Sequence, residues 1–124
     1  INREPNVGQY YNSKGSILAR IGRFDESFAA FAKAIELEPN NALFLESLGF
    51  AYVDLGNKLN EDATYLDNKA YAKAKVEIDA AYKNALPYFE KAYELEPDNE
   101  SFKHSLRSLY YRLGMNDKYE ALAD

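Results

Sequence analysis

The sequence contains no cysteine and no tryptophan, one methionine and one histidine. Without cysteine there are no disulfides, no zinc fingers and no thiol nucleophile. The single histidine, His104, has no partner serine that the sequence singles out, and a lone histidine on a helix is usually a surface or packing residue. We therefore expect no catalytic residue, no metal and no cofactor.

A net positive charge and long apolar runs are also absent from the sequence. The formal net charge is −5, whereas a nucleic-acid-binding protein needs a basic face, so we expect no nucleic-acid partner. No apolar run approaches the ~20 residues of a membrane-spanning helix, so we expect no membrane insertion. The composition, with 47% hydrophobic and 28% charged residues, is typical of one globular domain with a real core.

One segment of the sequence occurs twice, as FAAFAKAIELEPNN at 28–41 and as LPYFEKAYELEPDN at 86–99, and its tail appears in the opening INREPN. Recurrence this close is typical of a repeated structural unit. From Pro5 to Pro39 the numbering advances by 34, and from Pro39 to Pro97 it advances by 58, which is 34 plus 24. One unit therefore has a period of 34, and the next carries an insertion of 24.

These spacings divide the 124 residues into one domain of several units. We expect residues 1–5 to end a helix of a preceding repeat, 8–41 to form repeat 1, 42–99 an enlarged repeat 2, and 100–124 a degenerate or terminal repeat 3. The sequence begins at Ile1 without a secretory segment. Either a leader has been removed or the chain is a fragment, and INREPN favours a fragment or a member of a longer array.

The first unit predicts a helical hairpin. Apolar positions in residues 6–20 recur at helical spacing, and Gly22 ends that helix. Asp25 and Glu26 then lie in the first turn of a second helix, where carboxylates favour the helix dipole. This helix stops before Pro39, because the residue before a proline disfavours helical geometry.

The second unit predicts a longer hairpin. Its apolar stripe continues through Gly56, which predicts a single helix to about Tyr65; the alternative is a stop at Gly56 followed by a mobile loop. A return helix follows the Asp67-Asn68 turn, and each arm gains about 12 residues, a projection of ~18 Å. The inner seam resembles a short antiparallel coiled coil. Pro87 lies inside the return helix and predicts a kink rather than a break.

The end of the sequence predicts two further helices. The first runs from Glu100 to Leu113, and Gly114 ends it. Asn116 or Asp117 is expected to cap a final short helix from Lys118 to Ala123. Together with the two hairpins, these helices predict an all-α protein.

The repeated residues resemble the signature of the tetratricopeptide repeat, W-x2-L-G-x2-Y, then A-x3-F, then P. The matching residues of the first unit are Tyr11, Lys14, Gly15, Leu18, Ser27, Phe31, Ala34 and Pro39. Those of the second are Leu45, Leu48, Gly49, Tyr52, Ala85, Phe89, Ala92 and Pro97. In the third only Leu106, Tyr110 and Gly114 match, because Lys103 and Arg107 replace the aromatic residue and the glycine.

The resemblance covers nearly all of the sequence except about residues 57–81. It implies a superhelix of α-α hairpins, an α-solenoid, with one hairpin extended. The enlarged repeat and the ending LYYRLGMNDKYEAL are also similar to a group of bacterial proteins of this family.

The resemblance also implies a binding surface, because in this family the first helix of each hairpin lines a concave groove that holds a partner's peptide or helix. The positions carried over to this sequence are Asn12, Ser16, Ala19 and Arg20 in the first unit, Glu46, Phe50, Val53 and Asp54 in the second, and His104, Ser108, Tyr111 and Arg112 in the third. We call these the groove residues.

Three of the groove residues, Phe50, Val53 and Tyr111, are apolar and lie off the main core stripes, as expected of a binding groove. The alternative is that they pack against the adjacent helix. Arg20 and Arg112 are suited to fix an acidic group. The groove residues do not match the Lys/Asn/Lys/Arg pattern of members that clamp a chaperone's C-terminal carboxylate, since asparagine and serine stand at the first two positions.

Paired carboxylates are the remaining candidates for chemistry. The close pairs, Glu36 with Glu38, Glu94 with Glu96, and Glu61 with Asp62, are adjacent or next but one in the sequence, so on a helix they do not share a face. We interpret them as solvated charges. There is also no glycine-rich phosphate loop.

The sequence therefore favours a protein–protein interaction scaffold that binds a peptide or helix in its groove. The second hypothesis is a structural or assembly role, in which the projecting arm at about 57–81 or the exposed terminal helices mediate self-association into a homo-oligomer. An enzyme is the least favoured class.

Overall fold

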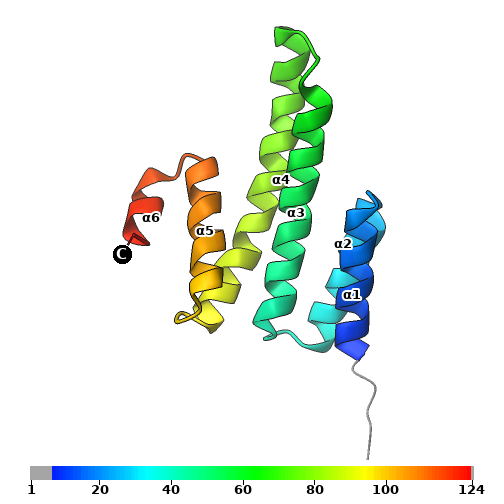
Figure 1. Cartoon of the computed structure of the whole chain (residues 1–124), viewed down its shortest axis with the longest axis vertical. Helices are drawn as coiled ribbons and strands as arrows, with labels where there is room; N and C mark the ends of the chain where they lie inside the picture. The colour runs from blue at the N-terminus through cyan, green and yellow to red at the C-terminus, as the bar shows by residue number, and fades with distance from the viewer. Residues whose placement is uncertain (1–6, 124) are drawn as a thin grey trace, which may run out of the picture.

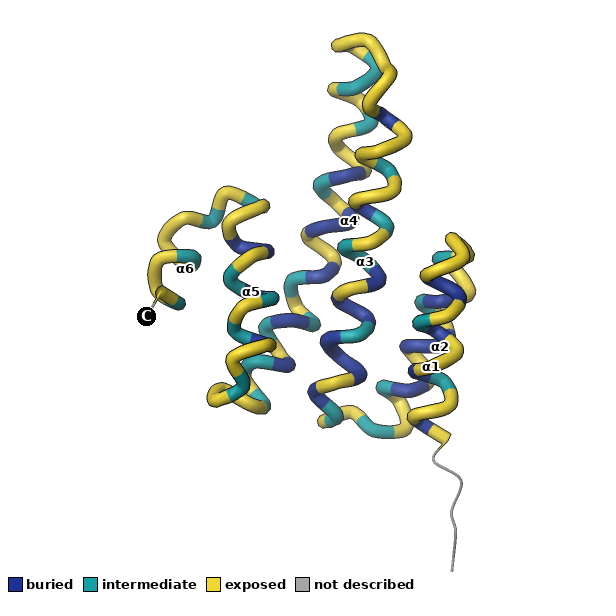
Figure 2. Tube along the Cα trace, viewed as in Figure 1, coloured by how far each residue is buried: buried dark blue, intermediate teal, exposed yellow. Residues whose placement is uncertain are grey.

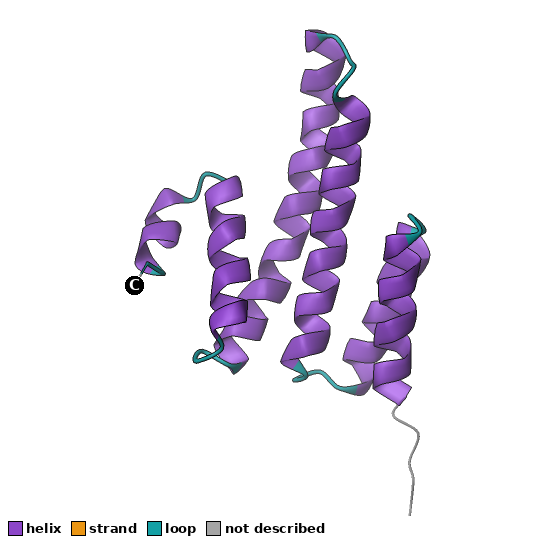
Figure 3. Cartoon of the chain, viewed as in Figure 1, coloured by secondary structure: helices purple, strands orange, loops and turns teal. Residues whose placement is uncertain are grey.

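A computed structural model describes residues 7–123, which form helices and contain no strand (Figure 3). The helices are α1 (Val7–Arg20), α2 (Phe24–Leu37), α3 (Ala42–Ala63), α4 (Asn68–Leu95), α5 (Glu100–Arg112) and α6 (Asn116–Ala121). The predicted all-α fold of helical hairpins is confirmed. The last helical turn that we predicted at residues 1–5 lies outside the described residues.

The helices pair in chain order, and the pairs lie side by side (Figure 1). Helix α2 packs against α3 and helix α4 against α5, and α1 also contacts α3. The α3–α4 hairpin is the longest and rises beyond both neighbours (Figure 1). The predicted enlarged arm is therefore present.

Glycine turns close the α1–α2 and α5–α6 connections. Gly22 has a φ of 84° and Gly114 a φ of 72°, the left-handed region that glycine adopts without a Cβ penalty. At the first turn, the Arg23 N–H donates to the Leu18 carbonyl at 2.8 Å and the Gly22 N–H to the Ala19 carbonyl at 3.0 Å. This is the Schellman arrangement, which satisfies the last carbonyls of a helix.

Three other helices begin at a side-chain cap. In each case a side-chain oxygen accepts the N–H three positions on: Asn41 from Phe44, Asp67 from Ala70, and Asn99 from Phe102. The predicted cap of α6 was wrong, because the helix begins at Asn116 itself and Met115 is at its N-cap without a side-chain bond. Met115 has no side-chain oxygen that could accept an N–H of the first turn.

Helix α3 passes through Gly56 without interruption, which confirms the single-helix prediction and makes the mobile-loop alternative wrong. The helix ends at Ala63, slightly earlier than predicted. A Cβ on Gly56 would lie 2.5 Å from the Tyr82 ring, and one on Gly49 would lie 2.5 Å from the Phe89 ring. Both aromatic residues are on α4, so the two helices approach closely at two successive levels.

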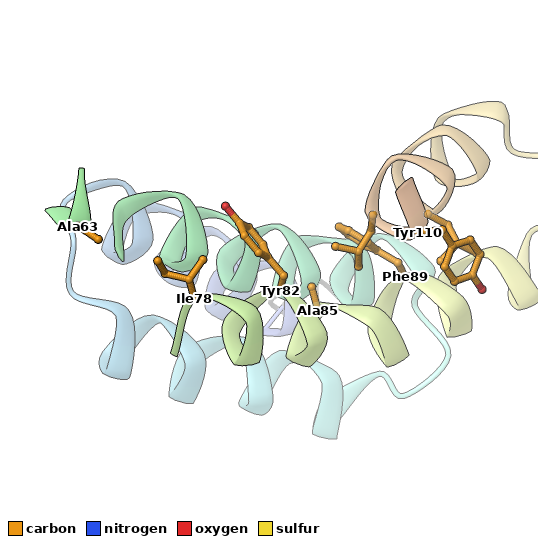
Figure 4. Packing of buried hydrophobic residues seen from close by; sticks show 8 residues of the cluster. Ala63, Ile78, Tyr82, Ala85, Phe89 and Tyr110 are labelled. Carbon is orange, nitrogen blue, oxygen red and sulfur yellow. The ribbon is translucent and has the colours of Figure 1, made fainter. Parts of the chain in front are cut away.

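Helix α4 is also continuous, with Pro87 inside it, so the prediction that this proline does not break the helix is confirmed. The kink itself stays a prediction. Helices α3 and α4, together with α5, carry a core that continues from the base of the long hairpin into the arm (Figure 4). Its buried members are Ala63, Ile78, Tyr82, Ala85, Phe89, Leu106, Leu109 and Tyr110.

Burial decreases toward the tip of the arm (Figure 2). The turn between α3 and α4 is exposed, and Tyr65 in it is 94% exposed. A smaller core cluster lies between the first two hairpins and includes Phe31 and Leu48. The fold therefore anchors the inner half of the long hairpin on both sides and leaves the outer half in solvent.

Candidate functional site

Helices α1, α3 and α5 carry the groove residues at equivalent positions of the three units, offset in the numbering by 34 and then by 58. Three neighbouring cavities follow these helices. The first is lined by Ser16, Ala19, Arg20, Phe50 and Asp54, the second by Phe50, Val53, His104, Ser108 and Arg112, and the third by His104, Ser108, Tyr111 and Arg112, together with further residues. The structure thus brings nearly all of the groove residues into one continuous series of cavities.

Phe50 lies at the junction of the first two cavities. Its ring is 44% exposed and packs edge-on against Phe89 of α4, with ring centroids 5.1 Å apart. Phe50 thus packs against the adjacent helix and also keeps an exposed surface, and its role in binding stays a prediction. One side of the ring is covered by α4, and the rest is exposed.

The other two apolar groove residues differ in exposure. Val53 is half-buried and packs against the main core cluster. Tyr111 is 68% exposed, and its ring centroid lies 5.3 Å from that of Tyr119 on α6. Because Tyr111 has most of its area in water, it is the groove residue with the most apolar surface left to bury.

The two groove arginines have different surroundings. Arg20 lies with Asp54 in two cavities on the α1 side, whereas Arg112 lines the two cavities on the α5 side. Arg112 Nη1 donates a hydrogen bond to the Tyr82 hydroxyl at 3.1 Å, and its guanidinium lies 4.7 Å from the Tyr82 ring centroid. The Tyr82 hydroxyl in turn donates to Asn57 Oδ1 at 2.6 Å. Arg112 is therefore tied to the base of the arm.

Asn12 and Glu46 line none of these three cavities. Each is only 7% exposed, and Asn12 Oδ1 and Glu46 Oε2 have no hydrogen-bond partner among residues 7–123. Burial raises the pKa of Glu46, against the opposing effect of a hydrogen bond from Ser105. Burial also raises the pKa of Asp54. The structure therefore covers two of the predicted groove positions.

The cavity at α5 has two lining residues that sequence reasoning missed, Arg107 and Tyr119. The Arg107 guanidinium lies 4.0 Å from the centroid of the Tyr119 ring. The signal for Arg107 was present in the sequence, because it occupies the position of Gly15 and Gly49 in the other units. No sequence pattern indicated Tyr119, since its position depends on how α6 folds back on α5.

Two other kinds of site are absent from residues 7–123. This part of the chain has no group of three or more His, Cys, Asp or Glu side chains that could hold a metal ion. None of its helices has the length and hydropathy needed to cross a membrane.

Comparison with known families gives two matches. A family model described as "TPR repeat" matches residues 15–56, and one described as "Tetratricopeptide repeat" matches residues 80–99, so together they cover half of the chain. Residues 57–79 lie between the two matches and form the outer part of the α3–α4 hairpin. No curated protein matches the sequence.

Comparison with solved structures shows the same fold. A monomeric mutant of IFIT1 with Gppp-AAAA overlaps with a TM-score of 0.75 and 20% sequence identity, over 90% of this chain and 24% of that chain. This chain therefore spans about a quarter of the length of that protein. The first TPR of Spaghetti (RPAP3), bound to the HSP90 peptide SRMEEVD, overlaps more weakly, with a TM-score of 0.39 and 24% identity, over 92% of this chain and 98% of that chain.

Proposed function

We propose that this chain, which belongs to the tetratricopeptide repeat family, is a scaffold whose groove binds an extended or helical segment of a partner protein. Repeats of this family are generally protein–protein interaction modules and are typically not enzymes. The observation that carries the proposal is the half-exposed Phe50 ring at the junction of two cavities. An apolar ring held on one side and open on the other is suited to anchor a partner.

In the proposed mechanism, Phe50, Val53 and Tyr111 supply the apolar contacts, and Arg20 and Arg112 orient the segment. Arg20 lines the cavity on the α1 side and Arg112 lines the two cavities on the α5 side, so they contact different parts of the segment. Tyr111 is the most exposed of the three apolar residues, so it has the most surface to bury in a complex. Aromatic anchors of this kind dominate many interfaces.

The experiment compares partners captured from a native lysate by the wild type and by Phe50→Asp plus Tyr111→Asp. Two carboxylates in the groove are expected to remove the specific partners, because a buried charge without a partner is costly. The matched control is Tyr65→Asp plus Val76→Asp, which replaces one aromatic and one aliphatic residue on the exposed arm. If the groove variant keeps the partner set of the wild type, the groove is not the binding surface.

A structural or assembly role is the second candidate, and one comparison within the chain favours it. Tyr10, Ile17 and Ile21 of α1 are each more than half exposed. The equivalent positions of α3, offset by 34 in the numbering, pack into the protein; Phe44 and Ala51 among them are buried. Helix α1 therefore has an apolar face that a preceding helix, or a second copy, is suited to cover.

Light scattering on the full chain and on an arm-excised form tests this second candidate. A dimer that persists after excision of the arm assigns self-association to the terminal helices, and one that dissociates assigns it to the arm. A monomer in both cases removes the self-association hypothesis.

We propose two further assignments. The first is the division into repeats at 8–41, 42–99 and 100–124. The second is the similarity of the enlarged repeat to bacterial members of the family.

A further inference from the structure

We propose that the cavity between α5 and α6 binds a phosphate monoester, carried on a phosphorylated side chain of a partner protein. The cavity has a volume of about 500 Å³. It is lined by His104, Arg107, Ser108, Tyr111 and Arg112 of α5 and by Tyr119 of α6.

The lining is basic although the chain as a whole is acidic, with a net charge of −5. It contains two arginines, one histidine and no carboxylate. Among residues 7–123, no carboxylate forms an ion pair with Arg107, Arg112 or His104. Two guanidinium groups beside one open cavity, without a carboxylate to pair them, favour an anionic ligand.

Arg107 is held in place before any ligand arrives. Its guanidinium lies over the Tyr119 ring, and its Nε is buried without a hydrogen-bond acceptor among the described residues. The planar fork of an arginine loses less freedom on binding when it is already stacked on an aromatic ring. Arg107 is therefore a preorganised cation beside the cavity.

Arg112 is held in a similar way from the other side. One of its N–H groups bonds to the Tyr82 hydroxyl, and the guanidinium lies beside that ring. A guanidinium has five N–H donors, so others remain for a ligand. The hydroxyls of Ser108 and Tyr111 add further donors along the same wall.

The charge of the lining favours a phosphate monoester over a carboxylate. A phosphate monoester carries about −1.5 to −2 charges at pH 7 and three acceptor oxygens, whereas a carboxylate carries one charge and two oxygens. Two guanidinium groups match the larger charge. Glu100 and Lys103 both line an adjoining cavity that shares His104 and Arg107, but neither lines the cavity of the proposal.

This inference rests on the proposed function in one respect only, namely that the phosphate is borne by a segment of a partner protein. The binding of phosphate is testable with small molecules and the full chain, without any partner. Failure of the titration below and failure of the capture experiment above are therefore separate results.

The test is a titration of the full chain at pH 7.5 with phenyl phosphate, benzoate, phenol and inorganic phosphate, followed by two-dimensional amide NMR. Phenyl phosphate is expected to shift amides of α5 and α6 and to bind about tenfold more tightly than benzoate, because one additional charge-assisted hydrogen bond is worth about that factor. Phenol, which lacks the charge, is expected not to bind.

Arg107→Gln is expected to weaken the binding of phenyl phosphate about tenfold or more. The matched control is Arg23→Gln, which removes an exposed arginine paired with Glu26 at the start of α2 and is expected to change nothing. If Arg107→Gln lowers the helix content, Arg107→Lys replaces it. This variant keeps the charge but loses the flat stack, and it is expected to weaken binding several-fold.

Three results would overturn the proposal. Benzoate binding as tightly as phenyl phosphate would make the site a carboxylate site. Inorganic phosphate binding as tightly as phenyl phosphate would show a site for the free ion rather than for a phosphorylated side chain. Equal affinities for wild type, Arg107→Gln and Arg23→Gln would place any binding elsewhere.

Discussion

The ring of Tyr82 occupies the space that a side chain on Gly56 would need, with its Cε1 2.5 Å from the position of a Cβ. Gly56 stands at the same place in its unit as Gly22 and Gly114, whose numbers are lower by 34 and higher by 58. Those two glycines adopt positive φ and end their helices. Gly56 instead lies inside α3. In the enlarged repeat, the glycine at this position therefore allows close packing of two helices instead of ending a helix.

Gly56→Ala is expected to destabilise the protein although alanine is the better helix former. Alanine in a helix interior is favoured by about 1 kcal/mol over glycine. Overpacking against the Tyr82 ring costs about 1–3 kcal/mol, so the net free energy of unfolding is expected to fall. Urea denaturation measures the change.

The control for Gly56→Ala is the same substitution in a Tyr82→Leu background. Without the ring, the added methyl group has space, and the helix propensity of alanine is expected to make the change neutral or stabilising. An equal loss in both backgrounds would mean that the ring is not the cause.

Tyr82→Phe is expected to lower the free energy of unfolding by about 1 kcal/mol per hydrogen bond lost. The hydroxyl donates to Asn57 and accepts from Arg112, so it links α3, α4 and α5. The matched control is Tyr71→Phe, whose hydroxyl donates to Asn60 at 3.2 Å in an exposed part of the arm. A smaller loss is expected there, because water replaces an exposed bond. Thermal unfolding of the two variants gives the comparison.

The sequence was sufficient to predict the long hairpin, because the evidence for it is local. The apolar stripe of α3 runs through Gly56 at helical spacing, and the turn signal at Asp67 marks where the chain reverses. The start of α6 was predicted wrongly for a local reason as well. Asn116 resembles a cap, but the glycine turn at Gly114 already determines where the next helix begins.

The candidate site was less predictable than the fold, because its properties depend on contacts between helices. The family resemblance indicated positions on α1, α3 and α5 but not their burial. Glu46 is covered because Ser105 of the next unit packs beside it, and Arg112 is tied down by Tyr82 of α4. The cavity beside α6 depends on Tyr119, whose partner Arg107 lies on another helix.

Glu46 predicts a pH dependence of stability. Burial raises the pKa of its carboxyl in the folded state. The folded protein therefore binds the carboxyl proton more tightly than the unfolded chain does. The stability from this group is fully present only below the unfolded pKa of about 4.3 and is lost as pH rises through the folded pKa. Glu46→Gln is therefore expected to gain stability relative to the wild type between pH 4 and pH 7, measured by urea denaturation at both values.

The control for this pH dependence is Glu36→Gln, which removes the same charge from an exposed position of α2. The two variants separate the burial of Glu46 from a change in net charge. Parallel curves for both, relative to the wild type, would contradict the assignment to burial.

Excision of residues 58–81 is expected to give a folded protein with an ordinary hairpin. The deletion removes the insertion and joins Asn57 to Tyr82, so Gly56, Asn57 and Tyr82 take the places of Gly22, Arg23 and Phe24 in the first hairpin. Gly56 then returns to the turn with positive φ, as Gly22 shows. Circular dichroism and cooperative urea unfolding measure whether the short form folds.

Gly56→Asn distinguishes the two roles of this glycine, because it is expected to behave differently in the two forms. In the short form the residue lies in a turn, and asparagine tolerates positive φ, so a loss of about 1 kcal/mol or less is expected. In the full chain the same side chain meets the Tyr82 ring inside a helix, and a loss of about 1–3 kcal/mol is expected. Equal losses of unfolding free energy in both forms would show that Gly56 has the same role in each. The insertion alone would then not determine whether this glycine ends a helix or packs inside one.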